Sequence, residues 1–536
     1  YEKLKSNKFG YQGLIYREAT ENLEYYINNN QDKQIVFVGF NALNKAEETI
    51  FQELLNNNVA KVYWDTNEAF LNKNNEAGVF DENKLNEFIA NLEAIQPETT
   101  LLNGSPINFE ASYNDLVIEG TVPTDLSGSL YRIGPNPKFV TGAYHWFFGT
   151  GMVHAFHVED GRVDYVNRWV RKPKFERETE LGHGLSLEMS INKATGQIES
   201  HRRNGVANTH IVTHGEHLLA LEEGSHPFSI EPTSLASSGY GHYADGIDGA
   251  MTAHPKVDPE TGELHGFGYM TDHFGSNTMT YHVIDKRGRT VRSDTFEAPY
   301  AAMVHDFMIT RDYVLFPVFP LTCDLSRIEK FGFPFAFDGQ AGAYIGVLAR
   351  GANVSTIQWI EAPSRYIFHY LNAWNDGTRV TFDAIDFPVA PNFPNVDGSI
   401  PAHADAQGKL TRWTLDVKTG AIDRHITLDV ASEFPRIDDR FTAARHRHGY
   451  IAAASKRAKG DGGLFHEITH FDYETGNAQT WDAGLGNGVS EPVFVEARGD
   501  AKEGEGWLLA TVYDPHSSTS SMVILDAERV EEGPVA

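Results

Sequence analysis

The chain has 536 residues, too many for one ordinary globular domain, although a large β-propeller can fill most of such a length. Its net charge of −28 provides no basic surface for phosphates, which argues against nucleic acid as a partner. A single cysteine, Cys323, excludes an intramolecular disulfide and a cysteine-rich metal site, and it favours a reducing compartment, so we expect a cytoplasmic protein.

Residues 1–96 differ in composition from the rest: they are rich in Asn and Lys, and Arg17 is their only arginine. A strand pattern at Gln34–Phe40, helical apolar spacing at Leu43–Leu55 and a second strand pattern at Val59–Trp64 predict a small α/β segment. The runs VFVGFNALNKAEETIFQELL and AKVYWDT resemble a fragment of the helicase-like region of bacterial PD-(D/E)XK nucleases. No phosphate loop or nuclease carboxylate cluster accompanies them, so we expect a remnant without activity, or a gene fusion.

From residue 107 onward, short alternating runs between turn signals predict an all-β domain, with residues 97–106 as a linker before it. Five runs carry an Asp-Gly or Thr-Gly pair between two strand patterns: VEDGRVDYVNRW, INKATGQIES, KVDPETGELHGFGYM, RWTLDVKTGAIDRHITL and HFDYETGNAQTWD. We expect these runs to form outer hairpins of propeller blades. Their spacing is irregular, so the residues alone leave a propeller and another large β fold as alternatives.

Three of the 23 histidines stand where an apolar run meets a turn: His254 in MTAHPKVD, His305 in MVHDFMIT and His369 in YIFHYLNAWNDG. Their separations, 305 − 254 = 51 and 369 − 305 = 64 residues, are near multiples of a blade length of about 40 to 50 residues, so each histidine can lie on its own blade. Neutral imidazoles suit iron, copper, zinc and nickel, so the residue type does not choose the metal. Most other histidines are expected to be ordinary solvated or hydrogen-bonded side chains.

Residues 107–536 carry a series of motifs in one order: VPTDLSGSLYRIGPNPKF, YHWFFGTGMVHAF, LLALEEG, TAHPKVDPETGEL, MVHDF, FHYLNAW, SEFPRIDDRF and SEPVFV. In these motifs the chain resembles the carotenoid cleavage oxygenase family, which includes lignostilbene-type dioxygenases. The resemblance implies a seven-bladed β-propeller with ferrous iron, Fe(2+), on its axis, held by four histidines. By motif, three of these ligands are His254, His305 and His369.

The resemblance also places glutamates behind the iron ligands: Glu223, Glu433 and Glu491. A carboxylate that accepts the second ring N–H of a metal-bound histidine fixes the tautomer and the orientation of the ring.

The fourth histidine of the family lies in a closing Gly-Phe-His-Gly segment, and this sequence stops at Ala536, before such a segment. The closing strand of the propeller would then be missing, which would leave the ring open. His516 follows a strand pattern but lies one strand too early to align, so we do not assign it as a ligand. The missing histidine leaves an alternative function, a catalytically impaired propeller that acts as a binding module.

The activity implied by the resemblance is that of a non-haem iron(II) dioxygenase, an oxidoreductase that cleaves a C=C bond with O₂ and gives two carbonyl products. The substrate is either a carotenoid or apocarotenoid, or a stilbene-type phenol. Stilbene-cleaving relatives hold and deprotonate a phenol with a tyrosine and a lysine, and the candidates here are Tyr144 and Lys172, with Lys174 as an alternative lysine. A lysine beside a buried phenol would favour the phenolate that pushes electrons into the alkene.

The expected partners are a small apolar or phenolic alkene and O₂, without nucleic acid. Aromatic residues could line the substrate tunnel, although core packing is the better explanation for any one of them: Phe147, Phe148, Phe316, Phe319, Phe331, Phe333, Phe335 and Phe337. The loop FGFPFAF could touch a membrane that holds an apolar substrate. No stretch approaches the roughly 18 apolar residues of a membrane-spanning helix.

Overall fold

The computed structural model describes residues 106–139, 149–185, 205–247, 249–327, 334–456 and 465–536, and short pieces at 27, 35–38, 50, 54, 60–63, 189–191 and 198–200. The chain divides into two compact units, Tyr1–Pro97 and Glu98–Ala536.

The first unit contains two short strands, β1 (Ile35–Val38) and β2 (Ala60–Tyr63), which pair in parallel. Both strands were predicted from the sequence. Parallel strands need a crossover connection, usually a helix. Of the helix expected at 43–55, the described residues Ile50 and Leu54 are helical, and the others lie outside the described residues.

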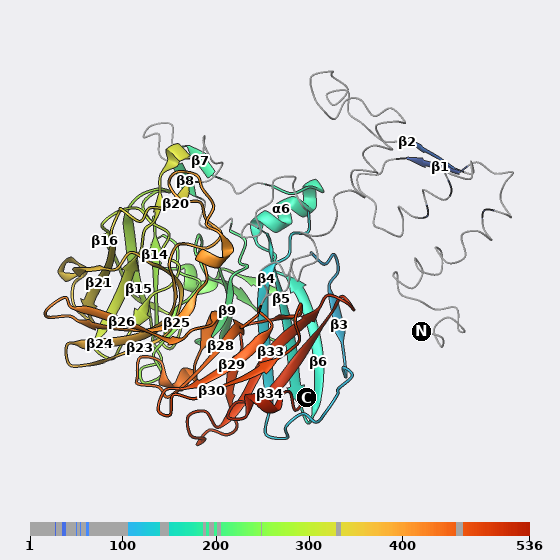
Figure 1. Cartoon of the computed structure of the whole chain (residues 1–536). Coiled ribbons are helices and arrows are strands. Elements are labelled where there is room, and N and C mark those ends of the chain that lie inside the picture. The colour runs from blue at the N-terminus through green and yellow to red at the C-terminus, as the bar shows by residue number, and fades with distance from the viewer. Residues whose placement is uncertain are drawn as a thin grey trace. The chain divides into compact units, whose positions relative to one another are not determined.

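The described residues of the second unit form seven four-stranded antiparallel sheets, which are the blades of a β-propeller (Figure 1). The first four blades are β3 (Ala111–Tyr113), β4 (Gly128–Pro135), β5 (Gly151–Glu159) and β6 (Arg162–Trp169); β9 (His210–His214), β10 (His217–Leu221), β11 (Phe228–Ile230) and β12 (Ser237–Gly239); β13 (Lys256–Val257), β14 (Leu264–Tyr269), β15 (Thr278–Ile284) and β16 (Thr290–Glu297); and β17 (Met308–Ile309), β18 (Tyr313–Val318), β21 (Ala343–Ala349) and β22 (Gln358–Ala362).

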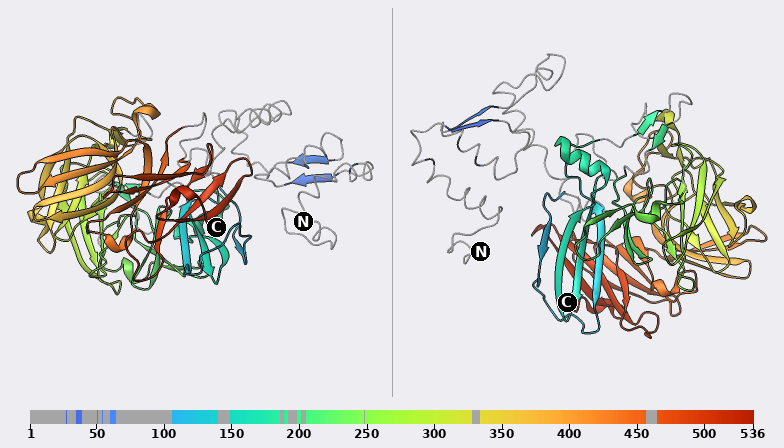
Figure 2. Two further views of the ribbon diagram at one scale, coloured as in Figure 1. Left: turned by 60° about the horizontal axis from the view of Figure 1, so that its bottom comes forward. Right: turned by 180° about the vertical axis from the view of Figure 1, so that it is seen from behind.

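The last three blades are β23 (Tyr366–Asp376), β24 (Arg379–Phe387), β25 (Lys409–Asp416) and β26 (Ile422–Leu428); β27 (Ala431–Arg436), β28 (His448–Ala454), β29 (Glu467–Asp472) and β30 (Ala478–Asp482); and β31 (Gly488–Val489), β32 (Val493–Glu496), β33 (Gly506–Asp514) and β34 (Thr519–Asp526). In the seventh blade β31 and β32 share one edge of β33, and β34 pairs with the other edge. The two additional views show the sheets following one another around the unit (Figure 2). The all-β propeller expected from the sequence is therefore confirmed.

Shorter elements decorate the blades. Their bounds are β7 (Met189–Ile191), β8 (Ile198–Ser200), β19 (Leu321–Cys323), β20 (Phe335–Phe337), α6 (Pro173–Leu181), and the 3₁₀ turns η5 (Gly241–Ala244), η6 (Leu325–Arg327), η7 (Val354–Thr356), η8 (His403–Asp405), η9 (Asp439–Phe441) and η10 (Val530–Glu532). The helix α6 begins at Pro173, whose fixed φ suits the first turn, and ends before Gly182 in the left-handed region. Within the described part of the chain, no helix is both long and apolar enough to cross a membrane.

All five predicted hairpins form, but only two of them are outer hairpins. β25–β26 and β29–β30 lie at the outer side of their blades, whereas β13–β14 opens its blade and β5–β6 lies in the middle of its sheet. β7 and β8 form a separate two-stranded sheet outside the blades. Turn residues thus predict that two strands pair, but a strand's place in a blade depends on the other strands that flank it.

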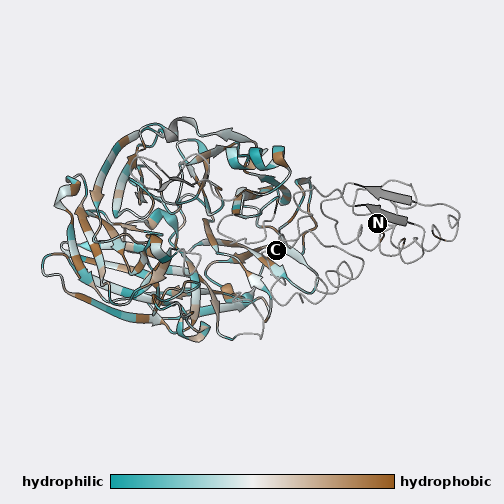
Figure 3. Cartoon of the chain, turned by 90° about the horizontal axis from the view of Figure 1, so that it is seen from above, coloured by the Kyte–Doolittle hydropathy of each residue, from teal (hydrophilic) through white to brown (hydrophobic). Residues whose placement is uncertain are grey.

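Neighbouring blades pack through shared apolar clusters. Figure 3 shows apolar residues distributed along the strands of all the blades, and helix α6 as largely hydrophilic. Going around the ring, each shared cluster contains residues of both blades: Val153 with Leu218, Leu219 with Leu264, Phe267 with Phe316, Leu315 with Phe382 and Ile451, Ile468 with Leu508, and Leu509 with Leu130. Burial of these side chains is the main force that holds the blades together.

The last cluster joins the seventh blade to the first, so the ring of blades is closed. Residues 534–536 pair antiparallel with β34: the N–H of Val535 donates to the Ile524 carbonyl at 2.8 Å, and the N–H of Ile524 donates to the Ala536 carbonyl at 2.9 Å. On the other side, the N–H of Thr121 donates to the Val535 carbonyl at 2.9 Å. The open ring expected from the sequence is therefore wrong, because these last residues already bridge the two ends of the propeller.

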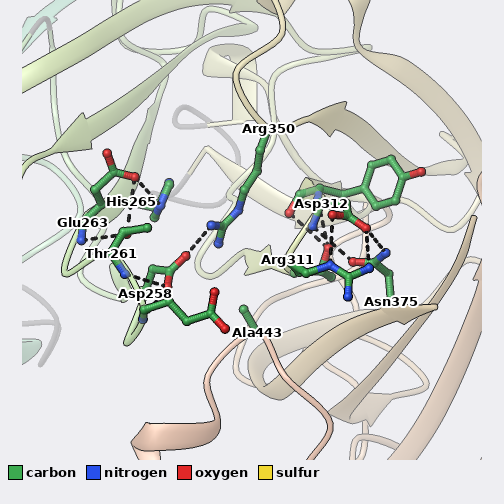
Figure 4. A network of polar contacts seen from close by, with 12 residues as sticks. Asp258, Thr261, Glu263, His265, Arg311, Asp312, Arg350, Asn375 and Ala443 are labelled. Atoms are coloured by element: carbon green, nitrogen blue, oxygen red, sulfur yellow. Dashed lines mark hydrogen bonds and ion pairs between the residues drawn. The ribbon is translucent and has the colours of Figure 1, made fainter. Parts of the chain in front are cut away.

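Polar contacts also cross between blades. Figure 4 shows Asp258, which follows β13, accepting a hydrogen bond from Arg350 at the end of β21 in the next blade. In the same view, Asn375 of β23 donates to the Asp312 carboxylate in the preceding blade at 2.7 Å. These pairs fix the register of adjacent blades, which the non-directional apolar contacts do not do by themselves.

Candidate metal centre

Three histidines from consecutive blades meet in the second unit. His254 comes just before β13, His305 just before β17, and His369 lies within β23, and each of these is the first strand of its blade. The pairing of β23 with β24 shifts register between Ile367 and Tyr370, which is a β-bulge at His369. Bulges re-aim side chains out of the regular alternation, and here the bulge turns an imidazole toward its two counterparts.

Hydrogen bonds of Thr252 tie two of these segments together. The His254 N–H donates to the Thr252 hydroxyl at 3.0 Å, and that hydroxyl donates to the His305 carbonyl at 3.3 Å. One small polar side chain therefore links the His254 segment to the His305 segment.

The three imidazoles have the geometry of a metal-binding set. One ring nitrogen of each lies within 4.8 Å of the others, and the Nε2 atoms of His254 and His305 are 2.9 Å apart. Two imidazoles bound at right angles to one metal, each at about 2.1 Å, would place their nitrogens about 3 Å apart. The spacing therefore fits one transition-metal ion that accepts nitrogen donors.

Two carboxylates fix the tautomers of two of these rings. Glu223 accepts a hydrogen bond from Nδ1 of His305 at 2.9 Å, and Glu433 accepts one from Nδ1 of His369 at 2.6 Å. With the proton held on Nδ1, the Nε2 lone pair of each neutral ring is available to a metal. Glu433 also accepts from the N–H of Phe434, whose φ of 55° is strained for a bulky side chain.

Glu491, the third predicted glutamate, lies against arginines. Its carboxylate is 3.5 Å from Arg436, and its carbonyl accepts a hydrogen bond from Arg132 at 3.2 Å. Burial alone would raise the pKa of Glu491, but Arg436 and the other cations around it lower that pKa below its ordinary value. His516 lies in the exposed turn between β33 and β34, outside the histidine cluster.

The histidines differ in their electrostatic surroundings. Burial lowers the pKa of His254 well below its ordinary value, and the nearby His305 and His369 lower it further. For His369, burial acts in the same direction, but the Glu433 carboxylate outweighs it and raises the pKa. A metal binds the neutral form of imidazole, so the lowered pKa of His254 favours its role as a ligand.

Three residues beside the cluster were missed by the sequence analysis. The ring of His210 stacks on His254 with centroids 5.3 Å apart, and its Nδ1 bonds to the Ala253 carbonyl at 2.8 Å. Phe368 meets His305 edge-on at 5.5 Å, and Phe434 lies 5.7 Å from His369. The only signal for the two phenylalanines was their place next to His369 and Glu433 in the FHYLNAW and SEFPRI motifs.

The candidate lysines occupy different environments. Lys172 is only 1% exposed; it donates to the Ser225 hydroxyl at 2.5 Å and lies 3.8 Å from Glu222. Burial lowers the pKa of Lys172 to about 8, although Glu222 acts against this. Lys174 pairs with the buried Glu178 on the same helix. Tyr144 lies outside the described residues.

The phenylalanines proposed for a tunnel are core residues wherever they are described. Phe316 packs against Phe296 and Phe307 between the third and fourth blades. The others in the described part of the chain belong to the largest apolar cluster: Phe319, Phe335 and Phe337. In the FGFPFAF loop, Phe335 and Phe337 are buried, which argues against membrane contact through them. The remaining candidates lie outside the described residues: Phe147, Phe148, Phe331 and Phe333.

Comparison with known proteins agrees with this architecture. The sequence matches the family described as RPE65, retinal pigment epithelial membrane protein, over residues 104–536. An isoeugenol monooxygenase of Pseudomonas nitroreducens is 34% identical over 80% of this chain and 92% of its own length. Carotenoid cleavage oxygenase 1 of Neurospora crassa is 30% identical over 81% of this chain and 86% of its own.

A solved structure shares the fold. The lignostilbene dioxygenase of Pseudomonas brassicacearum superposes with a TM-score of 0.75 at 30% identity, covering 80% of this chain and 92% of that one. The nuclease-like resemblance of residues 1–96 is not borne out, and the family match begins only at residue 104. The chain belongs to the RPE65 or carotenoid cleavage oxygenase family, and the relatives named above are oxygenases that cleave carbon–carbon double bonds.

Proposed function

We propose that this protein is an iron(II)-dependent dioxygenase that binds the metal through His254, His305 and His369 and cleaves the C=C bond of a phenolic alkene. The observation that carries the proposal is the convergence of three imidazoles, two of which are oriented by Glu223 and Glu433. Neutral nitrogen ligands suit iron(II), and the donor set leaves coordination positions open for other groups.

The protein residues orient the ligands and keep water away. When bound, ferrous iron would supply the site that takes up O₂ and activates it beside the alkene. Phe368 and Phe434 flank His305 and His369 with apolar rings, which favours an alkene over water next to the metal. The balanced reaction adds both atoms of one O₂ across the alkene, breaks the C=C bond and releases two carbonyl compounds.

Two observations favour a phenolic substrate. Relatives at about 30% identity or above are named for isoeugenol and lignostilbene, which are both phenols with a conjugated C=C bond. In addition, the buried Lys172, whose pKa burial lowers to about 8, can be a neutral amine near neutral pH and take the phenol proton. We infer that Lys172, together with Tyr144, holds and deprotonates the phenol.

A carotenoid-type substrate is the second candidate, because another relative is a carotenoid cleavage oxygenase. Such a substrate has no phenol, so its cleavage would not need Lys172. A catalytically impaired binding module, the third candidate, would hold an alkene without converting it.

The test combines metal analysis with product analysis. Protein loaded anaerobically with iron(II) is assayed for bound metal by mass spectrometry and for aldehydes formed from isoeugenol, a hydroxystilbene and an apocarotenoid. We expect about one iron per chain and cleavage of the phenolic substrates, with both lost in His305→Ala and both retained in His516→Ala. Iron without conversion of any alkene would favour the binding module, and cleavage of the apocarotenoid alone would overturn the phenolic assignment.

A further inference from the structure

A buried carboxylate contacts all three histidine-bearing segments of the centre. Asp306 follows His305 directly, and its side chain is 2% exposed. One oxygen of this carboxylate, Oδ1, lies 2.8 Å from the Lys256 ammonium, two residues after His254. The other, Oδ2, accepts a hydrogen bond at 3.0 Å from the N–H of Tyr370, the residue after His369.

These contacts come from three blades. Lys256 belongs to β13 of the third blade, Asp306 precedes β17 of the fourth, and Tyr370 lies in β23 of the fifth. The N–H of Tyr370 lies at the bulge in β23, where the register of the ladder shifts. Tyr370 itself pairs with Ala384, and the Asp306 carboxylate supplies the acceptor for its N–H beside the bulge.

The Asp306 carboxylate is almost fully enclosed by donors. The N–H of Phe307 donates to Oδ1 at 2.7 Å in addition to the contacts of Lys256 and Tyr370. A buried carboxylate is tolerated when a cation and hydrogen-bond donors compensate for its lost hydration, and removal of one partner leaves the other uncompensated. The arrangement is therefore stiff, and it fixes the relative positions of the blades at the histidines.

We propose that Asp306 is a positioning residue of the metal centre: through Lys256 and Tyr370, it sets the spacing of the segments that carry His254, His305 and His369. Asp306 does not act as a ligand; its own carboxylate is used by the three donors. This role rests on the metal site of the proposed function. It adds to that site a residue that fixes the relative positions of the three blades.

Asp306→Asn is the sharpest variant, because it conserves shape. In asparagine, an NH₂ group replaces one of the two carboxylate oxygens. This NH₂ donor would then face another donor, either the Lys256 ammonium or the Tyr370 N–H, and one hydrogen bond would be lost. Asp472→Asn is the matched control: Asp472 is also buried and also forms an ion pair, with Arg447 through two hydrogen bonds, but it lies in the sixth blade. Both variants remove the charge of a carboxylate that is paired with a cation, but only Asp306 contacts the histidine-bearing segments.

The probe is cobalt(II), whose visible absorption reports the geometry of its ligands, titrated into metal-free protein next to iron(II). We expect Asp306→Asn to weaken metal binding about tenfold or more and to change the cobalt spectrum, as alteration of groups that orient ligands generally does. Asp472→Asn should leave both unchanged. Lys256→Arg should retain the cobalt spectrum, because it keeps a cation beside Asp306. The double variant Lys256→Met/Asp306→Asn should bind metal no more weakly than Asp306→Asn alone, because the two residues act as one unit.

Two results would overturn the proposal, and they differ. If the unsubstituted protein binds metal and Asp306→Asn binds it equally well with the same cobalt spectrum, the positioning role is wrong while the metal centre stands. If neither protein takes up iron or cobalt, the metal centre itself is wrong and the positioning role falls with it.

Discussion

At the scale of single residues, two adjacent glutamates allow a test of the orienting carboxylates. Glu223 accepts from His305 at 2.9 Å, whereas its neighbour Glu222 lies 3.8 Å from Lys172. We expect Glu223→Gln to weaken iron(II) binding by about 10- to 100-fold, because the His305 ring loses the acceptor that holds its tautomer. Glu222→Gln should leave metal affinity unchanged. Competition with a metal-sensitive dye measures both constants, and equal affinities in the two variants would contradict the assignment.

The role of Lys172 predicts a pH dependence. Burial lowers its pKa to about 8, so the neutral amine that can accept a proton becomes more populated as pH rises through that value. Turnover of a phenolic alkene should therefore increase with pH up to about 8 and then level off. Lys172→Met should abolish this rise and reduce turnover by about 100-fold or more, which is the usual contribution of a general base.

Two controls separate this from a general effect of pH. Lys174→Met removes a lysine that is already paired with Glu178, so it should keep the pH profile. The methyl ether of the same alkene has no phenol proton, so its cleavage should show no step near pH 8. A pH profile that is identical in Lys172→Met and the unsubstituted enzyme would rule out the proposed base.

At the scale of elements, blade stability and metal binding should be separable. Trp413 of β25 is fully buried, and its ring stacks on Phe382 of β24 with centroids 5.7 Å apart. We expect Trp413→Ala to lower the free energy of unfolding by about 3 to 5 kcal/mol, through lost burial and a cavity. Ile426→Ala on the adjacent β26, where the side chain is 48% exposed, should change it by less than about 0.5 kcal/mol.

Denaturant unfolding measures the change in the free energy of unfolding in both variants. Metal analysis of the folded fraction then shows whether the metal site is retained. Because Trp413 lies on β25, two strands away from the strand that carries His369, folded Trp413→Ala protein should still bind one metal per chain. Loss of metal from protein that remains folded would mean that packing within the fifth blade, and not the polar contacts, sets the site.

Hairpins were predictable from the sequence because their turn residues are a local signal. The hairpins β13–β14 and β29–β30 formed where Thr-Gly pairs separate two strand patterns, because tight antiparallel turns need residues that tolerate positive φ. The bulge at His369 was not predictable, because it depends on which residues of β24 lie opposite. For the same reason, the contact of Asp306 with Tyr370 left no trace in either local motif.

At the scale of the whole molecule, the candidate site could be predicted from motifs and its surroundings could not. The motifs selected His254, His305 and His369, and the fold brings them together. The stacking of His210 on His254 joins different blades, and no periodicity within a strand encodes such a contact. Closure of the ring was unpredictable for the same reason. The N–H of Thr121 donates to the carbonyl of Val535, and these residues are 535 − 121 = 414 positions apart in the sequence.

The number of oxygen atoms that the enzyme inserts distinguishes two reactions, since one relative is called a monooxygenase and another a dioxygenase. The most direct measurement is cleavage of a phenolic alkene by the iron-loaded enzyme under ¹⁸O₂, with the aldehydes reduced at once to prevent exchange with water and analysed by mass spectrometry. We expect one ¹⁸O atom in each of the two carbonyl products. Label in only one product, or in neither, would contradict it.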